Sequence, residues 1–228
     1  MTMTTQTRVL TRMRDVGLAL NAGSQFHQML GRIRLQKFVY LLDVMIYLVE
    51  LLPPSERHVT YKHGPFDAAI QNAVDCLAFR GLVRIADLHR APDGTTQAKY
   101  ALTAAGRDWV LKLSSDPQFR IRAQVAASIA VEIDSIGWDR LVALVYAEPT
   151  FVASRALGYG TKLNPQNPMS NSAALVLTTM RRGLRVGFER TSPEPQLLLR
   201  LFFRYLRDFS LLKDQKLSLT RSGVGGAI

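Results

Sequence analysis

The first fifty residues of the chain have the periodicity of helices. Apolar residues such as Val9 and Met13 recur at intervals of three or four, which predicts an amphipathic helix over residues 6–21. A second helix is predicted from Arg32 to about Leu52. Apolar residues surround this second helix on nearly every side, so we expect it to lie inside a domain rather than on its surface.

The segment that follows predicts a short extended piece and a third helix. Residues 58–63 favour extended backbone, and Gly64-Pro65 predicts a turn. Asp67 precedes a stripe of apolar residues, so we expect its carboxylate to accept backbone N–H bonds at the start of a helix. Gly81 is the expected end of that helix.

A β-hairpin is predicted immediately afterwards. Residues 82–86 and 97–102 have the pattern of strands, and the turn residues 92–95 separate them. A helix from Thr103 to Leu113 completes the order helix, helix, short strand, helix, hairpin, helix. This order is typical of a winged helix-turn-helix, in which the hairpin forms the wing. Residues 1–113 are therefore predicted to form a winged-helix module.

Residues 114–228 have helical patterns and predict a helical extension. Apolar positions continue from Ile121 to Tyr146, and Pro149 ends them. Residues 158–171 are rich in Gly, Pro and Asn, which predicts a loop, and a last helix is expected from Gln196 to Lys213. The predicted fold class is mostly α with a small β-hairpin. The extension should pack back on the module or form an oligomer interface.

The charge of the chain favours a polyanionic partner. Its 228 residues include 29 basic and 18 acidic side chains, a net charge of +11, and 22 of the basic residues are arginine. Arginine suits planar contacts with phosphate better than lysine does. The basic residues occur in both halves of the chain. DNA binding therefore requires that cations distant in sequence meet in one continuous positive surface beside the hairpin.

The sequence also predicts the cellular compartment of the protein. No run approaches the roughly 20 apolar residues of a membrane span, and the N-terminus lacks the apolar core of a signal peptide. Cys76 is the single cysteine, so no internal disulfide can form. We expect a cytoplasmic protein without a membrane partner.

Three short sequence anchors resemble a known group of proteins. They are Leu35-Gln36-Lys37 with Tyr40, the Gly64-Pro65 turn, and the Gly81-Leu82 entry to the hairpin. Residues 30–150 resemble prokaryotic winged-helix proteins of the YwgA type and, more distantly, the Panacea antitoxin domain. The resemblance implies a winged-helix fold in a regulator, an antitoxin or an accessory subunit of a phage-defence cassette. It supplies no catalytic residue.

The candidate nucleic-acid contacts fall on four elements. Gln71 and Asn72 lie on the helix that would enter a major groove, and their amides suit the edge of adenine. Phosphate contacts are expected from the start of the second helix, from the wing and from the last helix, where arginines repeat along one face. The expected phosphate contacts are Arg32, Arg34, Lys37, Arg84, Arg90, Lys99, Arg200, Arg204 and Arg207.

Each of these motifs also has an ordinary structural interpretation. Lys37 and the wing cations can be solvated surface residues, and the last helix can be a core or partner helix with a charged face. Asp67 and Asp75 would oppose phosphates if they lay on the exposed side of the third helix. A further cluster, Arg181, Arg182, Arg185 and Arg190, lies upstream of the last helix.

The residues needed for catalysis or metal binding are not arranged in any known motif. His27, His58, His63 and His89 are not spaced as metal ligands, and Cys76 is expected to pack as a small hydrophobe. The Gly158–Lys162 segment lacks the order of a phosphate loop. We therefore expect no enzyme, no cofactor and no metal.

The leading hypothesis is a non-enzymatic protein that binds double-stranded DNA, acting in transcription regulation, as an antitoxin or in antiviral defence. The alternative is a winged-helix subunit that docks a toxin, nuclease or ATPase from the same operon without touching DNA. Asp67 and Asp75 favour the alternative, and the net charge favours DNA. Either is compatible with a homo-oligomer or a larger complex.

Overall fold

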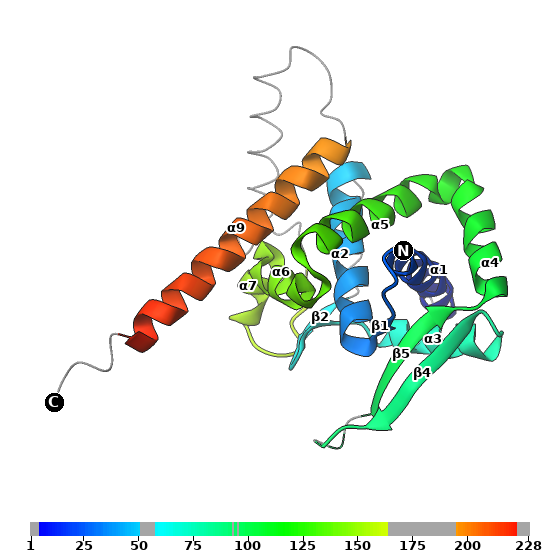
Figure 1. Cartoon of the computed structure of the whole chain (residues 1–228), viewed down its shortest axis with the longest axis horizontal. Coiled ribbons are helices and arrows are strands. Elements are labelled where there is room, and N and C mark those ends of the chain that lie inside the picture. The colour runs from blue at the N-terminus through cyan, green and yellow to red at the C-terminus, as the bar shows by residue number, and fades with distance from the viewer. Residues whose placement is uncertain (1–4, 51–57, 93, 95, 164–194, 223–228) are drawn as a thin grey trace, which may run out of the picture.

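The computed structural model describes residues 5–50, 58–92, 94, 96–163 and 195–222. Helix α2 (Arg32–Glu50) lies at its centre (Figure 1). Its residues from Leu35 to Ile46 are buried except for the half-buried Asp43, as the nearly all-round apolar pattern predicts. The helices that pack on α2 are α1 (Thr5–Ser24), α5 (Pro117–Ile136), α6 (Leu141–Ala147) and α9 (Pro195–Ser222).

One antiparallel sheet runs in the order β1-β5-β4. Leu30 of β1 pairs with Tyr100 of β5, and Val83 of β4 pairs with Leu102 of β5. The predicted hairpin is thus present, with a longer first strand than expected and an irregular register between Ala86 and His89. It projects from the body of the molecule (Figure 1). The three strands are β1 (Leu30–Gly31), β4 (Val83–Arg90) and β5 (Thr96–Leu102).

A second, smaller hairpin joins α2 to α3. It consists of β2 (Val59–Tyr61) and β3 (Gly64–Phe66), with Thr60 opposite Pro65. The prediction that Gly64-Pro65 forms the turn is wrong, because Lys62 and His63 make the turn. Gly64, with a φ of +91°, instead opens β3.

Helix α3 (Ala68–Phe79) begins and ends where the sequence predicts. The Asp67 carboxylate accepts a hydrogen bond of 3.0 Å from the backbone N–H of Ala69. Gly81 follows the helix with a φ of +69°, a conformation that glycine adopts without the steric cost that a Cβ brings.

Helix α4 (Ala104–Ser115) starts close against the hairpin. Thr103 accepts a hydrogen bond of 3.0 Å from the Gly106 N–H at the start of the helix. A Cβ on Gly106 would lie 2.0 Å from the carbonyl oxygen of Leu82. Glycine is therefore required for the close contact between α4 and the entry to β4.

The C-terminal half packs against the N-terminal half in one hydrophobic core. Phe38 of α2 stacks on Trp138, with ring centroids 6.2 Å apart. Pro149 ends one helix and starts another, α7 (Pro149–Arg155), which the sequence pattern did not predict. Residues 164–194, including the cluster from Arg181 to Arg190, lie outside the described residues. The remaining element is the 3-10 turn η1 (Trp138–Arg140).

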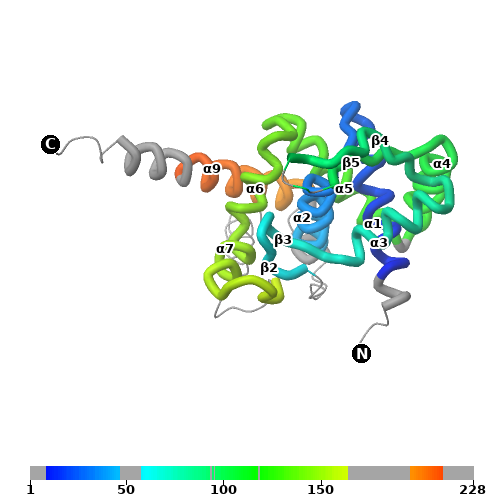
Figure 2. The backbone as a smooth tube through the Cα atoms, turned by 90° about the horizontal axis from the view of Figure 1, so that it is seen from below, coloured from blue at the N-terminus to red at the C-terminus, as the bar shows by residue number. Residues whose placement is uncertain are grey.

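Figure 2 shows α9 reaching away from the body on the side remote from β4 and β5. This helix extends to Ser222, further than the sequence predicts. Over the described part of the chain, no helix has the length and apolar character needed to cross a lipid bilayer.

Candidate nucleic-acid interface

A buried ion network fixes α3 to the rest of the fold. Arg12 of α1 is fully buried, and its guanidinium contacts three carboxylates. It pairs with Asp15 at 2.8 Å, with Asp43 of α2 at 2.7 Å and with Asp67 at 2.8 Å. Because Asp67 also caps α3, a single arginine joins the starting point of α3 to α1 and α2.

A second arginine completes the network from α5. Arg122 pairs with Asp15 at 2.6 Å and with Asp43 at 2.7 Å. Burial alone would raise the pKa of Asp43, but the charges of Arg12 and Arg122 outweigh it and hold that pKa well below its usual range. Burial and the charge of Arg12 lower the pKa of His58 to about 3, so its ring is neutral at physiological pH.

The acidic residues of this network are neutralised by arginine and are not arranged as metal ligands. Within the described ranges, no group of three or more His, Cys, Asp or Glu residues is placed to hold a metal ion.

Asp67 does not lie on the exposed face of α3, the position from which it would oppose DNA phosphates. Its side chain is buried, and its backbone is held by Gln36. The Gln36 amide donates to the Asp67 carbonyl at 3.0 Å, and the Gln36 side-chain oxygen accepts from the Asp67 N–H at 3.0 Å. The objection to DNA binding that rested on two acidic residues therefore applies to Asp75 alone.

The assignment of Lys37 as a phosphate contact is wrong. Its residue exposure is 2%, and its ammonium donates a hydrogen bond of 3.0 Å to the carbonyl oxygen of Pro65. Burial lowers the pKa of Lys37 to about 7. The error has a simple cause: a helix that is apolar on nearly all sides is buried on nearly all sides, including the side that carries its lysine.

The exposed face of α3 is only weakly basic. Gln71 is half-buried and is held within the protein, since its amide donates to Asp75 at 3.0 Å and its oxygen accepts from Tyr100 at 3.4 Å. Asn72 is exposed and is the candidate that remains for contact with a base edge. Near the end of the helix, Arg80 is exposed.

Two other residues of this face differ from expectation. Cys76 is exposed rather than packed among apolar neighbours. Phe79 is 94% exposed, and nothing in the sequence pattern marks it as a surface residue. Phe79 lies at the edge of the apolar stripe of α3. Helical spacing alone does not show that its side chain is exposed while the neighbouring apolar residues are in the core.

The outer face of the β4–β5 hairpin collects several of the predicted cations. Arg84 lies opposite Ala101 and Lys99 lies opposite Ala86. Directly opposed residues of an antiparallel pair share a face, so Arg84 and Lys99 point to the same side, away from the buried Tyr100. Lys99 also pairs with the exposed Asp87 at 2.8 Å.

The remaining predicted cations of the hairpin and of α2 lie around this face. Arg90 lies toward the tip of the hairpin, where it donates a hydrogen bond of 3.3 Å to the Gly94 carbonyl. Arg32 starts α2 directly after Gly31, which is the partner of Lys99 in the sheet. Arg34, the third residue of α2, is half-buried.

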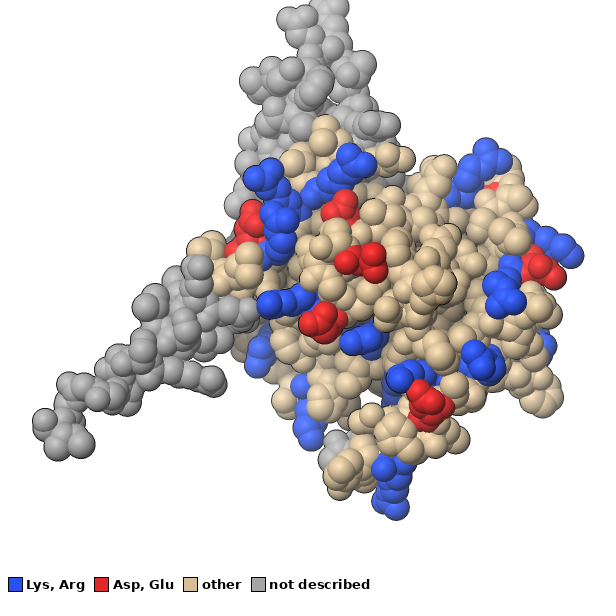
Figure 3. All heavy atoms as spheres, in the orientation of Figure 1, with Lys and Arg blue, Asp and Glu red and all other residues tan. Residues whose placement is uncertain are grey.

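The arginines of α9 do not join this group. Arg200, Arg204 and Arg207 are exposed along a groove between α9 and α5, and the nearest acidic groups are at 4.0 Å for Arg200–Glu132 and 3.2 Å for Arg207–Asp208. Figures 1 and 2 both place α9 away from the hairpin. In Figure 3, basic side chains are spread over the surface with acidic ones among them. Among the described residues, the α9 arginines therefore do not form one continuous positive surface with the hairpin cations, and only the start of α2 brings further basic residues close to the hairpin.

Comparison with models of known protein families gives no match to this chain, and a search of curated proteins gives none.

Proposed function

We propose that this protein binds double-stranded DNA through a winged helix-turn-helix formed by its N-terminal half. The positive surface of this proposal is limited to the β4–β5 hairpin and the start of α2, and it excludes the α9 arginines. The observation that carries the proposal is the order of the elements. Helix α1, strand β1, helix α2, helix α3 and the β4–β5 hairpin follow one another, with the small β2–β3 hairpin inserted between α2 and α3. Strand β1 pairs with the second strand of the β4–β5 hairpin to give the sheet β1-β5-β4. In a winged helix, α3 is the helix that enters the major groove and β4–β5 is the wing.

In this proposal, the two parts of the interface have different tasks. Asn72 contacts a base edge, and Arg80 at the end of α3 contacts a phosphate. Arg84, Arg90 and Lys99 on the wing, with Arg32 beside it, supply contacts to the DNA backbone that are independent of sequence. The buried ion network favours this role, because a reading helix must keep a fixed orientation relative to the wing.

Salt-dependent binding to DNA tests the proposal. Fluorescence anisotropy with a short labelled duplex is measured over a range of salt concentrations. The slope of log affinity against log salt is about −0.9 for each phosphate contact, so Arg84→Ala and Arg90→Ala should each make the slope shallower by about 0.9. Asn72→Ala should weaken binding to a selected sequence and leave this slope unchanged.

The matched control is Lys112→Ala, which removes an exposed cation from α4. It should leave the slope of the native protein unaltered. Failure of the full-length protein to bind DNA at low ionic strength would refute the proposal. Equal effects of Lys112→Ala and Arg84→Ala would show a non-specific attraction to net charge.

A second candidate function is the docking of a protein partner through α3. The exposed face of this helix carries Phe79, which is 94% exposed, together with Asp75 and Cys76. Large apolar residues in such positions are typical of protein interfaces, where aromatic side chains contribute much of the affinity.

The two functions are separated by changes on the α3 face. In the docking function, Phe79→Ala combined with Asp75→Lys abolishes co-purification of a stoichiometric partner. The same double variant retains DNA binding if DNA is the ligand, because it adds a positive charge to the face. Asp67→Lys is unsuitable for this purpose, since Asp67 is buried and its replacement would disrupt the core.

The role in an antitoxin-like or phage-defence cassette is part of the proposal and follows from the resemblance over residues 30–150. A toxin, nuclease or ATPase gene adjacent to the gene for this protein would support it. Such a neighbour would also supply the partner for the co-purification experiment.

A further inference from the structure

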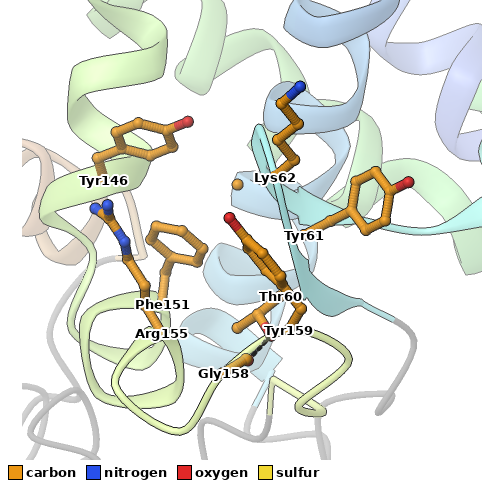
Figure 4. Close-up of a pocket in the computed structure, with 9 residues that line it drawn as sticks. Thr60, Tyr61, Lys62, Tyr146, Phe151, Arg155, Gly158 and Tyr159 are labelled. Atoms are coloured by element: carbon orange, nitrogen blue, oxygen red, sulfur yellow. Dashed lines mark hydrogen bonds between the residues drawn. The ribbon is translucent and has the colours of Figure 1, made fainter.

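A cleft lies at the opposite end of the β2–β3 hairpin from α3, between this hairpin and helices α6 and α7. Its volume is about 200 Å³. The side chains that give it chemical character are Tyr61, Lys62, Tyr146, Phe151, Arg155 and Tyr159. In Figure 4, the rings of Tyr146, Phe151 and Tyr159 surround the opening, and Arg155 lies beside Tyr146.

The walls of this cleft are held in place by backbone bonds. Residues 158–163, which follow α7, run beside β2 and bond to it. The Thr60 N–H donates to the Thr161 carbonyl at 2.9 Å, and the Gly160 N–H donates to the Thr60 carbonyl at 2.8 Å. The Leu163 N–H donates to the His58 carbonyl at 2.9 Å. The cleft is thus already formed without a ligand, so less conformational entropy is lost when a ligand binds.

The lining combines flat apolar rings with positive charge. Tyr146 and Phe151 stack with centroids 5.3 Å apart, and the Arg155 guanidinium lies 5.9 Å from the centre of the Tyr146 ring. Tyr159 is 77% exposed, so its ring is available for stacking. Lys62 and Arg155 are both exposed, and no acidic residue is among the described residues that line the cleft. These groups favour a planar ring joined to an anion.

The buried Lys37 lies behind the wall of the cleft at Gly64. A Cβ at this position would come within 2.9 Å of the Lys37 ammonium and 2.7 Å of the Tyr146 ring. The lysine is fully enclosed there, with the Pro65 carbonyl as an acceptor. Because burial lowers its pKa to about 7, Lys37 carries only part of a positive charge at neutral pH, and the anion-binding charge of the cleft comes from the exposed Lys62 and Arg155.

We propose that this cleft binds a small organic anion in which a planar ring is linked to a phosphate or carboxylate group. The ring stacks against Tyr159 beside the Tyr146–Phe151 pair, and the anionic group is held by Arg155, while Lys62 adds positive charge at the rim. The site is separate from α3 and the wing. The proposal therefore stands whether or not the protein binds DNA.

Calorimetric titration of the full-length protein tests this proposal. The probes are AMP, which has a ring and a phosphate, and benzoate, which has a ring and a carboxylate. Adenosine and ribose 5-phosphate serve as probes that lack the anion or the ring. We expect AMP or benzoate to bind at least about tenfold more tightly than adenosine and ribose 5-phosphate. Whichever of AMP and benzoate has the higher affinity shows whether the site prefers a phosphate or a carboxylate.

Two variants locate the binding. Arg155→Gln removes the guanidinium and Tyr159→Ala removes the exposed ring, and each should weaken the stronger probe by about tenfold. Lys112→Gln, on the distant α4, is the matched control and should leave binding unchanged. Far-UV circular dichroism verifies that each variant is folded. The proposal is overturned if neither AMP nor benzoate binds, or if binding persists equally in Arg155→Gln and Tyr159→Ala.

Discussion

Replacing Arg12 with methionine removes the central charge of the buried network while keeping most of the side-chain length. In the variant, Asp15 and Asp43 retain the second arginine, Arg122, whereas Asp67 loses the guanidinium that pairs with it at 2.8 Å. Removing one partner of a buried ion pair costs about 3–5 kcal/mol. A domain has a total unfolding free energy of about 5–15 kcal/mol, so this loss is a large share of the whole.

Urea unfolding followed by far-UV circular dichroism measures this loss. Arg12→Met should lower the unfolding free energy by about 4 kcal/mol. Asp67→Asn keeps a side-chain oxygen that can cap α3 and removes the charge that Arg12 neutralises. The double variant should therefore lose less than the sum of the two single variants, by more than about 1 kcal/mol.

The matched control is Arg120→Met, an exposed position on α5. A surface substitution of this kind should change stability by no more than about 0.5 kcal/mol. The reasoning is refuted if Arg12→Met costs less than about 1 kcal/mol, or if the effects of Arg12→Met and Asp67→Asn simply add. Either result would mean that the network does not act as a unit.

Two further predictions concern packing and titration. The lowered pKa of Lys37, about 7 against an ordinary 10.5, means that the unfolded chain binds more protons between these values. The unfolding free energy of the native protein should therefore rise with pH across this range relative to Lys37→Met, and a parallel pH dependence of the two proteins would contradict the assignment. At Gly106, an added Cβ would meet the Leu82 carbonyl at 2.0 Å, whereas at Gly81 it would meet nothing within 4 Å. Thermal unfolding should therefore show Gly106→Ala to be clearly more destabilising than Gly81→Ala, whose left-handed backbone costs about 1 kcal/mol, and equal effects would contradict the close contact.

The sequence was a good guide to the elements, because their signals are local. The N-cap at Asp67, the helix end at Gly81 and the two strands of the hairpin depend on residues that are neighbours in the chain. Hydrophobic periodicity predicted the buried helix α2 for the same reason. Pro149 shows the limit of such signals, because the same residue both ends α6 and begins α7.

The environment of charged residues was much harder to predict. Arg12 was not singled out by any pattern, yet it contacts carboxylates 3, 31 and 55 positions away. Lys37 was predicted as a surface contact and is buried, and Asp67, whose exposure the pattern left open, is buried too. Burial depends on helices that arrive from distant parts of the chain. The separation of the α9 arginines from the hairpin has the same origin, because it is decided by how α9 packs on α2, α5 and α6.

In the proposed DNA-binding role, the attachment of α3 to the core limits how affinity could be regulated. The residue that caps α3 is tied to α1 through its carboxylate and to α2 through its backbone. The helix therefore cannot swivel alone, since any tilt would separate buried charges from their partners. A signal that alters the proposed recognition must instead displace the whole module, or act on the projecting hairpin, whose described tip residues take part in no buried ion network. Hydrogen exchange would reveal this contrast as slow amides at the start of α3 and fast ones near Arg90.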